Sequence, residues 1–239
     1  MSDINAKCKI RIIEGGPYLV SGNVPISEQI IIPKAGGYEF QEGRELPQSE
    51  AYALCRCGKS TNAPFCDGSH YNHNFRGKET ASKNRYHERA ERMEGPGVDL
   101  LDDGRCAFAR FCHRRNGDAW ELVEHSDAGN NREEAIRAAC DCPSGRLTAV
   151  DMDGTEYENE YIPSIDIIQD PERRVSAGIF VKGHILIESA DGTPYEVRNR
   201  VALCRCGESR NKPFCDAAHV AVQYLDSAVT KRGPSVKKK

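Results

Sequence analysis

An internal repeat constrains this chain more than any other feature of its sequence. Residues 54–70 read LCRCGKSTNAPFCDGSH, and residues 203–219 read LCRCGESRNKPFCDAAH. Twelve of the 17 positions are identical, without a gap. A motif that occurs twice in 239 residues predicts two copies of one structural unit, so we expect two similar small units.

The segments upstream of each copy are short and rich in β-branched and aromatic residues, with Gly and Pro between them. PYLVSG, QIIIPK and GYEFQEG precede the first copy, and AGIFVKGHILIE and TPYEVRNR precede the second. These patterns predict short strands and turns. Hydrophobic residues make up only 38% of the chain and aromatic residues 7%, which disfavours one large core. We therefore expect an α+β protein with two small β-rich units.

Each copy places three cysteines and one histidine at the spacing Cys-x-Cys-x8-Cys-x3-His. These thiolate and imidazole donors suit zinc or an iron–sulfur cluster. Zinc sites usually contain Cys-x2-4-Cys pairs. The tighter Cys-x-Cys pair can instead hold one iron of a two-iron cluster, with the remaining Cys and His on the other iron, so we favour iron–sulfur over zinc. The candidate ligands are Cys55, Cys57, Cys66 and His70 in the first copy, and Cys204, Cys206, Cys215 and His219 in the second.

Composition narrows the cellular and functional class. The chain has 11 cysteines, and disulfides alone cannot pair an odd number. The N-terminus, MSDINAKCKIRII, is charged where a secretory signal would be apolar, and no apolar run could span a membrane. The net charge of −3 disfavours a nucleic-acid partner. We expect a cytoplasmic protein whose clustered cysteines bind metal.

A different module separates the repeats, over residues 76–168. AWELVE at 119–124 predicts a strand, and NNREEAIRAAC at 130–140 predicts a helix that Asn130 or Asn131 caps, followed by a strand in RLTAVDMDG. The arrangement Cys106-x5-Cys112 with Cys142-Pro143 is similar to a bacterial ferredoxin site that has Ala109 in place of its middle cysteine. We expect Cys106, Cys112 and Cys142 to hold a cluster. Cys140 is either a fourth ligand or a buried thiol on the helix.

The repeated motif itself resembles the CDGSH (mitoNEET-like) iron–sulfur domain family. The first copy has the pentapeptide of that family intact, Cys66-Asp67-Gly68-Ser69-His70, whereas the second reads Cys215-Asp216-Ala217-Ala218-His219. The resemblance implies a [2Fe-2S] cluster on each Cys3His set, and two units that can pair as an intramolecular pseudo-dimer. We expect Asp67 to cap the turn after Cys66. We also expect Gly68 to adopt a backbone angle that Ala217 tolerates poorly.

The middle module resembles single-cluster ferredoxins and the divergent [4Fe-4S] domains that accompany CDGSH units, of which Cys-Pro-Ser-Gly is typical. This resemblance implies one [3Fe-4S] or [4Fe-4S] cluster in a ferredoxin-like α+β module. The predicted domains are 1–75 and 169–230 for the two CDGSH units, 76–168 for the module between them, and 231–239 for a basic disordered tail.

Three clusters in one chain predict an electron carrier rather than an enzyme that converts a substrate itself. Its partner would be a reductase or an oxidase. Cluster storage, transfer to an apo-acceptor protein, cluster repair, redox or pH sensing, and a role as an accessory component of an oxidoreductase are the alternatives. No nucleotide-binding or Ser-His-Asp motif occurs in the sequence.

Overall fold

The computed structural model describes residues 8–232, and its fold is built on two β-sheets that exchange strands. In the first sheet, the order is β14-β1-β2-β5, and β14 from the second half of the chain pairs parallel with β1. In the second sheet, the order is β15-β13-β12-β3-β4, and β3 from the first half pairs parallel with β12. The strands of the first half are β1 (Lys9–Ile12), β2 (Tyr18–Ser21), β3 (Ile26–Lys34), β4 (Gly37–Glu42) and β5 (Ala51–Leu54).

The strands of the second half repeat this pairing scheme. β12 and β13 are antiparallel, as are β1 and β2, and β15 continues the sheet beyond β13 as β5 does beyond β2. The first half therefore gives β3 and β4 to the sheet of the second half, and the second half gives β14 to the sheet of the first. These strands are β12 (Ser164–Asp170), β13 (Val175–Lys182), β14 (Leu186–Glu188) and β15 (Arg200–Leu203).

One hydrophobic core lies between the two sheets and joins both halves. Its buried side chains come from β1, β2 and β5 on one side and from β12, β13 and β15 on the other. Alternating apolar residues of the short strands supply it, for example Ile10 and Ile12 with Ile165 and Ile167, all at most 1% exposed. Burial of this apolar surface stabilises the strand exchange, because both halves contribute side chains to the same core.

The strands predicted upstream of each motif copy are present, with one exception. PYLVSG, QIIIPK and GYEFQEG contain β2, β3 and β4, and AGIFVKGHILIE contains parts of β13 and β14. TPYEVRNR is mostly irregular, with an isolated bridge between Glu188 and Pro194 and with Arg200 beginning β15.

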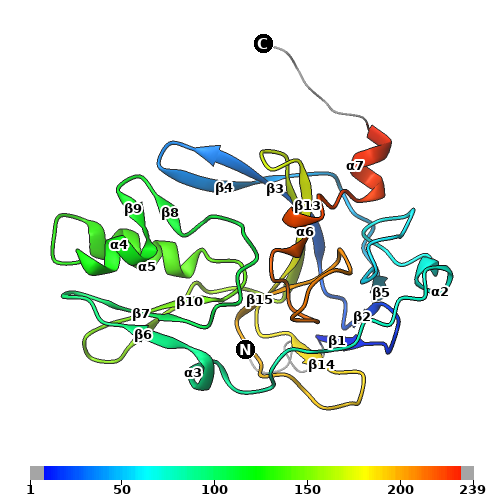
Figure 1. Cartoon of the computed structure of the whole chain (residues 1–239), viewed down its shortest axis with the longest axis horizontal. Coiled ribbons are helices and arrows are strands. Elements are labelled where there is room, and N and C mark those ends of the chain that lie inside the picture. The colour runs from blue at the N-terminus through cyan, green and yellow to red at the C-terminus, as the bar shows by residue number, and fades with distance from the viewer. Residues whose placement is uncertain (1–7, 233–239) are drawn as a thin grey trace, which may run out of the picture.

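The middle module has its own sheet and core. The sheet has the order β11-β10-β7-β6, from β6 (Glu91–Met93), β7 (Asp99–Asp102), β10 (Leu147–Val150) and β11 (Glu156–Tyr157). A hairpin of β8 (His113–Arg114) and β9 (Gly117–Asp118) leads into helices α4 (Ala119–Glu124) and α5 (Asn131–Cys140). These helices pack their Ala, Leu and Val side chains on β7 and β10. In Figure 1, this module lies at the end opposite α2, with α6 between the two.

The prediction of a strand at 119–124 is wrong, because this segment is helix α4. Asp118 accepts hydrogen bonds from the backbone N–H groups of Trp120 and Glu121, and Glu121 completes a capping box. This cap favours a helix in a six-residue segment that could otherwise form a strand.

Helix α5 confirms the predicted helix, although neither predicted cap forms as expected. Asn130 stands at the N-cap without a side-chain hydrogen bond, and Asn131 is the first helical residue. The buried face consists of Ala135, Ala138, Ala139 and Cys140.

The remaining helices are short. They are α2 (Ser69–Asn72), α3 (Tyr86–Arg89), α6 (Ala218–Ala221) and α7 (Ser227–Arg232). The predicted basic tail begins at residue 231, but α7 extends to Arg232, and residues 233–239 lie outside the described residues. Within residues 8–232, no helix has the length and apolarity that a membrane span requires.

The two motif loops contact each other through paired glycines. A Cβ on Gly58 would lie 2.4 Å from the carbonyl oxygen of Cys206, and a Cβ on Gly207 would lie 2.6 Å from that of Cys57. Both glycines also have positive φ, of 71° and 86°. Only glycine provides both the backbone angle and the close approach that these two positions require.

We predict that Gly58→Ala and Gly207→Ala each destabilise the protein by about 3 kcal/mol or more, because strain and a backbone clash add. Gly68→Ala is the matched control: Gly68 has φ of 86°, but a Cβ there meets no atom within 4 Å. It should cost only about 1 kcal/mol. Thermal unfolding of the three variants tests this, and equal losses at Gly58 and Gly68 would contradict the loop contact.

Candidate metal centres

The first Cys3His set comes together at the end of β5. Cys55 and Cys57 follow this strand directly, and their Sγ atoms lie 3.7 Å apart. Cys66 lies on the loop that leads into α2 and His70 lies in α2, with 3.4 Å between Sγ and Nδ1. Cys55, Cys57 and His70 are 4%, 6% and 7% exposed, whereas Cys66 is half-buried.

The second set repeats this geometry at the end of β15. The Sγ atoms of Cys204 and Cys206 lie 3.6 Å apart, and 3.5 Å separates Sγ of Cys215 from Nδ1 of His219. This set is more deeply buried, because Cys215 is 3% exposed and His219 is 2% exposed. Burial lowers the pKa of His219 to about 4, with a further contribution from Arg205, so this imidazole is neutral and able to act as a ligand.

Backbone N–H groups of the first motif loop point at its thiols. Those of Ser60, Gly58 and Cys57 donate to Cys55, and that of Lys59 donates to Cys57. Together with the bond from the Cys57 thiol, the largest contribution, they lower the pKa of Cys55 to about 6. Amide donors that stabilise thiolates are a feature expected around iron–sulfur ligands.

The donor pairs suit a binuclear centre better than a single ion. Each set consists of two close pairs, Cys–Cys and Cys–His. Two pairs can each bind one iron of a two-iron cluster. The chemistry of three thiolates and one neutral imidazole also fits such a cluster.

The acidic residue after the third cysteine fixes the ligand loop in both copies. Asp67 accepts hydrogen bonds from the backbone N–H groups of Thr61 and Ser69. A hydrogen bond from the Ser69 side chain and these two backbone bonds lower the pKa of Asp67. Asp216 accepts the equivalent bonds from Arg210 and Ala218. The predicted role of Asp67 at the turn after Cys66 is thereby confirmed.

The backbone angle expected at Gly68 is present in both copies. Gly68 has φ of 86°, and Ala217 has φ of 67°. Alanine in this conformation costs about 1 kcal/mol, so the second copy keeps its loop against a local strain.

Two buried arginines, one between the paired cysteines of each set, support the ligand loops and were not among the residues predicted from the sequence. Arg56 donates to the carbonyl oxygens of Ile13, Gly16 and Gly77. Arg205 donates to the carbonyl oxygens of Ala177 and Ile168 and to the carboxylate of Asp226. The signal was present, since both copies read Cys-Arg-Cys. These guanidinium groups tie each ligand strand to neighbouring segments and place positive charge near the thiols.

The middle module brings three cysteines to one cavity. Cys106, Cys112 and Cys142 line it, with Trp120 among the apolar side chains around them. Burial and the nearby Cys142 and Cys106 raise the pKa of Cys112 to about 12. Cys140 is 5% exposed on α5 and is not part of the lining, and burial raises the pKa of its thiol to about 11. The cavity therefore offers three thiol ligands.

The loop between Cys106 and Cys112 is held in an unusual conformation. Phe108 and Arg110 have positive φ, of 59° and 66°. The buried guanidinium of Arg110 forms two hydrogen bonds with Asp170, of 2.6 and 3.0 Å, and a third with Glu172. This ion pair attaches the loop to the end of β12 and offsets its strain.

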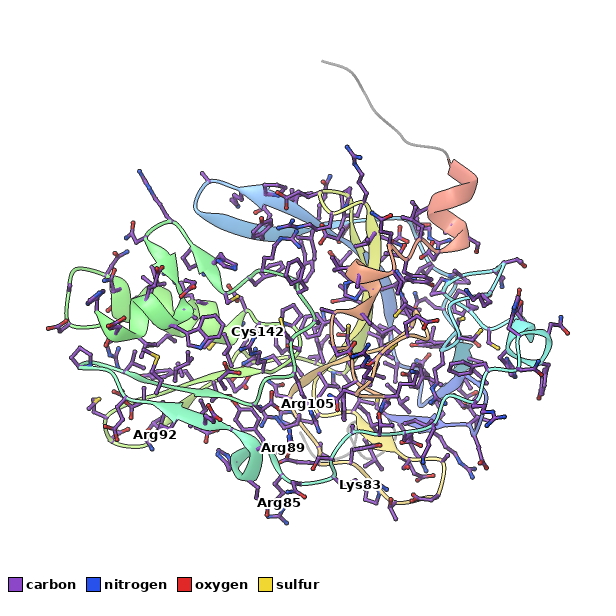
Figure 2. The ribbon with its side chains drawn as sticks, viewed as in Figure 1. Lys83, Arg85, Arg89, Arg92, Arg105 and Cys142 are labelled. Carbon is purple, nitrogen blue, oxygen red and sulfur yellow. The ribbon has the colours of Figure 1, made fainter. Side chains whose placement is uncertain are left out.

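The cavity of the middle module lies against the second Cys3His set. Ala107 packs against Cys215 and Ala202 in one buried cluster. The guanidinium of Arg105 lies 4.2 Å from the ring centroid of Phe214, the residue before Cys215. Figure 2 shows Arg105 below Cys142 in this view. The contact thus involves Cys215 itself and the residues on either side of Cys106.

Arg200 reinforces the same junction from β15. Its buried guanidinium donates to the carbonyl oxygens of Ala139, Cys142 and Leu147, and it pairs with Glu158. The strand that ends at the second set thus also holds the loop of Cys142. No sequence motif predicts this contact, and only the fold reveals it.

Comparison with known proteins agrees with these geometries. Residues 15–71 and 178–220 match the family described as iron-binding zinc finger CDGSH type, and residues 93–152 match the family described as divergent 4Fe-4S mono-cluster. Neither a curated protein nor a solved structure matches the chain. The chain is an iron–sulfur protein with two CDGSH-type iron-binding segments on either side of a divergent 4Fe-4S mono-cluster segment.

Proposed function

We propose that the chain is an electron carrier with three clusters. Each Cys3His set would hold a [2Fe-2S] cluster, and Cys106, Cys112 and Cys142 would hold a [3Fe-4S] or [4Fe-4S] cluster. The clusters supply one-electron redox chemistry when bound, and their different ligand sets give them different potentials. The protein would exchange electrons with a reductase or oxidase and would not itself convert a substrate.

One observation carries this proposal: the three sites form a continuous series of contacts. The first and second motif loops touch through Gly58 and Gly207. The second set touches the middle module through Ala107 and Cys215. A row of adjoining redox sites is what stepwise electron tunnelling needs. The reciprocal strand exchange supports an intramolecular pseudo-dimer of the two CDGSH units.

The chain's own residues would keep these sites able to bind clusters and would influence their potentials. The Cys57 thiol and backbone amide donors lower the pKa of Cys55, and Arg56 and Arg205 add positive charge close to the ligand strands. Burial keeps the second set away from water. Hydrogen bonds to the ligands, nearby positive charge and burial each affect the reduction potential of a bound cluster.

The proposal predicts the iron and sulfide content of protein purified without oxygen. Two [2Fe-2S] clusters and one [4Fe-4S] cluster give about eight irons and eight sulfides per chain, and a [3Fe-4S] cluster lowers the iron to about seven. EPR distinguishes these cases, because an oxidised [3Fe-4S] cluster is paramagnetic. About four irons and four sulfides, or zinc without sulfide, would contradict the proposal.

The middle site gives a matched pair of cysteine variants. Cys106→Ala should remove the middle cluster and lower the iron per chain by three or four, because two thiols remain in the cavity. Cys140→Ala should leave the iron and sulfide content unchanged, since Cys140 does not line the cavity. Loss of the middle cluster in Cys140→Ala would show that Cys140 is a ligand.

Cluster transfer is a second candidate, which the exposure of the first set favours. Cys66 is half-buried, whereas its counterpart Cys215 is 3% exposed. In this account, His70→Cys should slow transfer of a [2Fe-2S] cluster to an apo-ferredoxin by about tenfold or more, because a thiolate replaces the neutral imidazole ligand. His219→Cys is the control and should have little effect. Unchanged transfer in His70→Cys would leave electron transfer as the better account.

A further inference from the structure

The cavity of the middle site is lined by a cation as well as by three thiols. Arg146 lines this cavity together with the three candidate ligands of the middle site. It lies directly before β10, and its carbonyl oxygen accepts hydrogen bonds from the Tyr86 hydroxyl and from the backbone N–H of Asp103. The backbone of Arg146 is therefore fixed by the sheet of the middle module.

Two contacts also fix the side chain of Arg146. Its Nε and Nη2 atoms each donate a hydrogen bond of 2.6 Å to a different carboxylate oxygen of Asp102. The guanidinium carbon lies 5.0 Å from the ring centroid of Trp120, which lines the same cavity. A bidentate pair with a carboxylate fixes the plane of a guanidinium, so Arg146 keeps one position relative to the thiols.

Arg146 acts on two of the three candidate ligands. Hydrogen bonds with Asp102 are the main reason that the pKa of Arg146 is raised, and the charge of Cys106 and a hydrogen bond with its side chain add to this rise. At Cys112, the positive charge of Arg146 opposes the rise in thiol pKa that burial and the other two cysteines cause. Arg146 therefore stabilises negative charge on the sulfur atoms of both cysteines.

Two other cations near this cavity have different partners. Arg110 lines the cavity too, but its guanidinium forms two hydrogen bonds with Asp170. Arg200 lies near Cys142, but it donates to backbone carbonyl oxygens and pairs with Glu158. These two arginines join the module to its neighbours, whereas Arg146 and its carboxylate partner both belong to the middle module and adjoin the thiols.

Neutral donors near the same thiols allow a comparison of strength. The backbone N–H of Phe108 donates to Sγ of Cys106 over 3.3 Å, and 3.3 Å separates Oγ of Ser144 from Sγ of Cys142. A hydrogen bond from a charged donor is roughly twice as strong as a neutral one. Loss of the Arg146 guanidinium should therefore affect a bound cluster more than loss of the Ser144 hydroxyl.

We propose that Arg146 sets the reduction potential of the cluster in the middle site, through its charge and its hydrogen bond to Cys106. Reduction adds one negative charge to a cluster. A cation and a hydrogen-bond donor at a sulfur ligand stabilise the reduced form more than the oxidised form, so Arg146 raises the potential. Asp102 has the opposite effect, because its carboxylate partly neutralises the guanidinium. The proposal rests on the function proposed above, in which a cluster occupies this cavity.

The test is an anaerobic redox titration of the cluster-loaded full-length protein, followed by EPR. The signal of the middle cluster is identified by its absence in Cys106→Ala. At the potential that reduces half of the middle clusters in the unmodified protein, Arg146→Gln should lower the ratio of reduced to oxidised cluster about tenfold or more. Arg146→Lys should lower it less, because lysine keeps the charge. Asp102→Asn should raise the ratio severalfold, because it removes the carboxylate charge and keeps an oxygen acceptor for the guanidinium.

Arg132→Gln is the matched control in the same module. Arg132 also pairs with a carboxylate, that of Asp151 at 2.9 Å, and its guanidinium lies 5.7 Å from the ring centroid of Tyr157. Because Arg132 does not line the cavity, its replacement should leave the ratio within about twofold of the unmodified protein. An unchanged ratio in Arg146→Gln, an equal decrease in Arg132→Gln, or a decrease in Asp102→Asn would overturn the proposal.

The iron and sulfide content distinguishes failure of this proposal from failure of the proposed function. If Cys106→Ala holds as much iron and sulfide as the unmodified protein, no cluster occupies the middle site and the three-cluster function fails. If the middle cluster is present but the Arg146 and Asp102 variants keep its potential, only the role of Arg146 fails. If Arg146→Gln loses the cluster, Asp102→Asn decides, since a higher ratio supports the proposal and an unchanged or lower ratio overturns it.

Discussion

The contact between the two motif loops is the constraint on which the rest of the structure depends. The loops approach so closely that the positions of Gly58 and Gly207 have no room for a side chain. This approach is possible because β3 and β14 each cross to the opposite sheet and join the halves around one core. Tyr18 of the first half adds a direct link, donating its hydroxyl to the carbonyl oxygens of Cys204 and Pro213 in the second. The two candidate centres are thus two parts of one packed unit.

The middle module breaks the symmetry that the repeat creates. It attaches to the second half through Arg200 and Arg110, whose buried guanidinium groups bridge it to β15 and to Asp170 at the end of β12. Removing the partner of a buried charge is costly, so these paired guanidinium groups favour one arrangement of the two parts. As a result, the second Cys3His set is enclosed while the first keeps an exposed surface. Two nearly identical motifs therefore have different environments.

Much of the candidate site could be predicted from the sequence, because ligand spacing is local. The Cys-x-Cys pair sits at the end of a strand, and the Cys-x3-His pair spans a tight turn whose geometry Asp67 fixes. The three cysteines of the middle site are farther apart in sequence, yet their ferredoxin-like spacing still predicted that they meet. Local sequence also predicted most strands and helix α5, and failed at AWELVE, where the Asp118 cap outweighs strand preference.

The arrangement of the parts could not be predicted in the same way. Strand exchange depends on which strand edges meet across the core, and no local pattern encodes the pairing of β1 with β14 or of β12 with β3. The same holds for Arg105 on Phe214, a contact between residues more than a hundred positions apart in the sequence. These long-range contacts determine which centres adjoin and which surface remains free. Short motifs thus determine which residues are candidate ligands, whereas the fold determines the order of the centres.

The central claim is that the three centres form a series with the second Cys3His set in the middle. EPR of the fully reduced protein tests it most directly, because adjacent paramagnetic clusters broaden or split each other's signals. We expect the first-set and middle-site signals both to show such interaction with the second set, and both to sharpen when Cys215→Ala empties it. Isolated, unsplit signals in the unmodified protein, or an interaction between the first set and the middle site that survives in Cys215→Ala, would contradict this account.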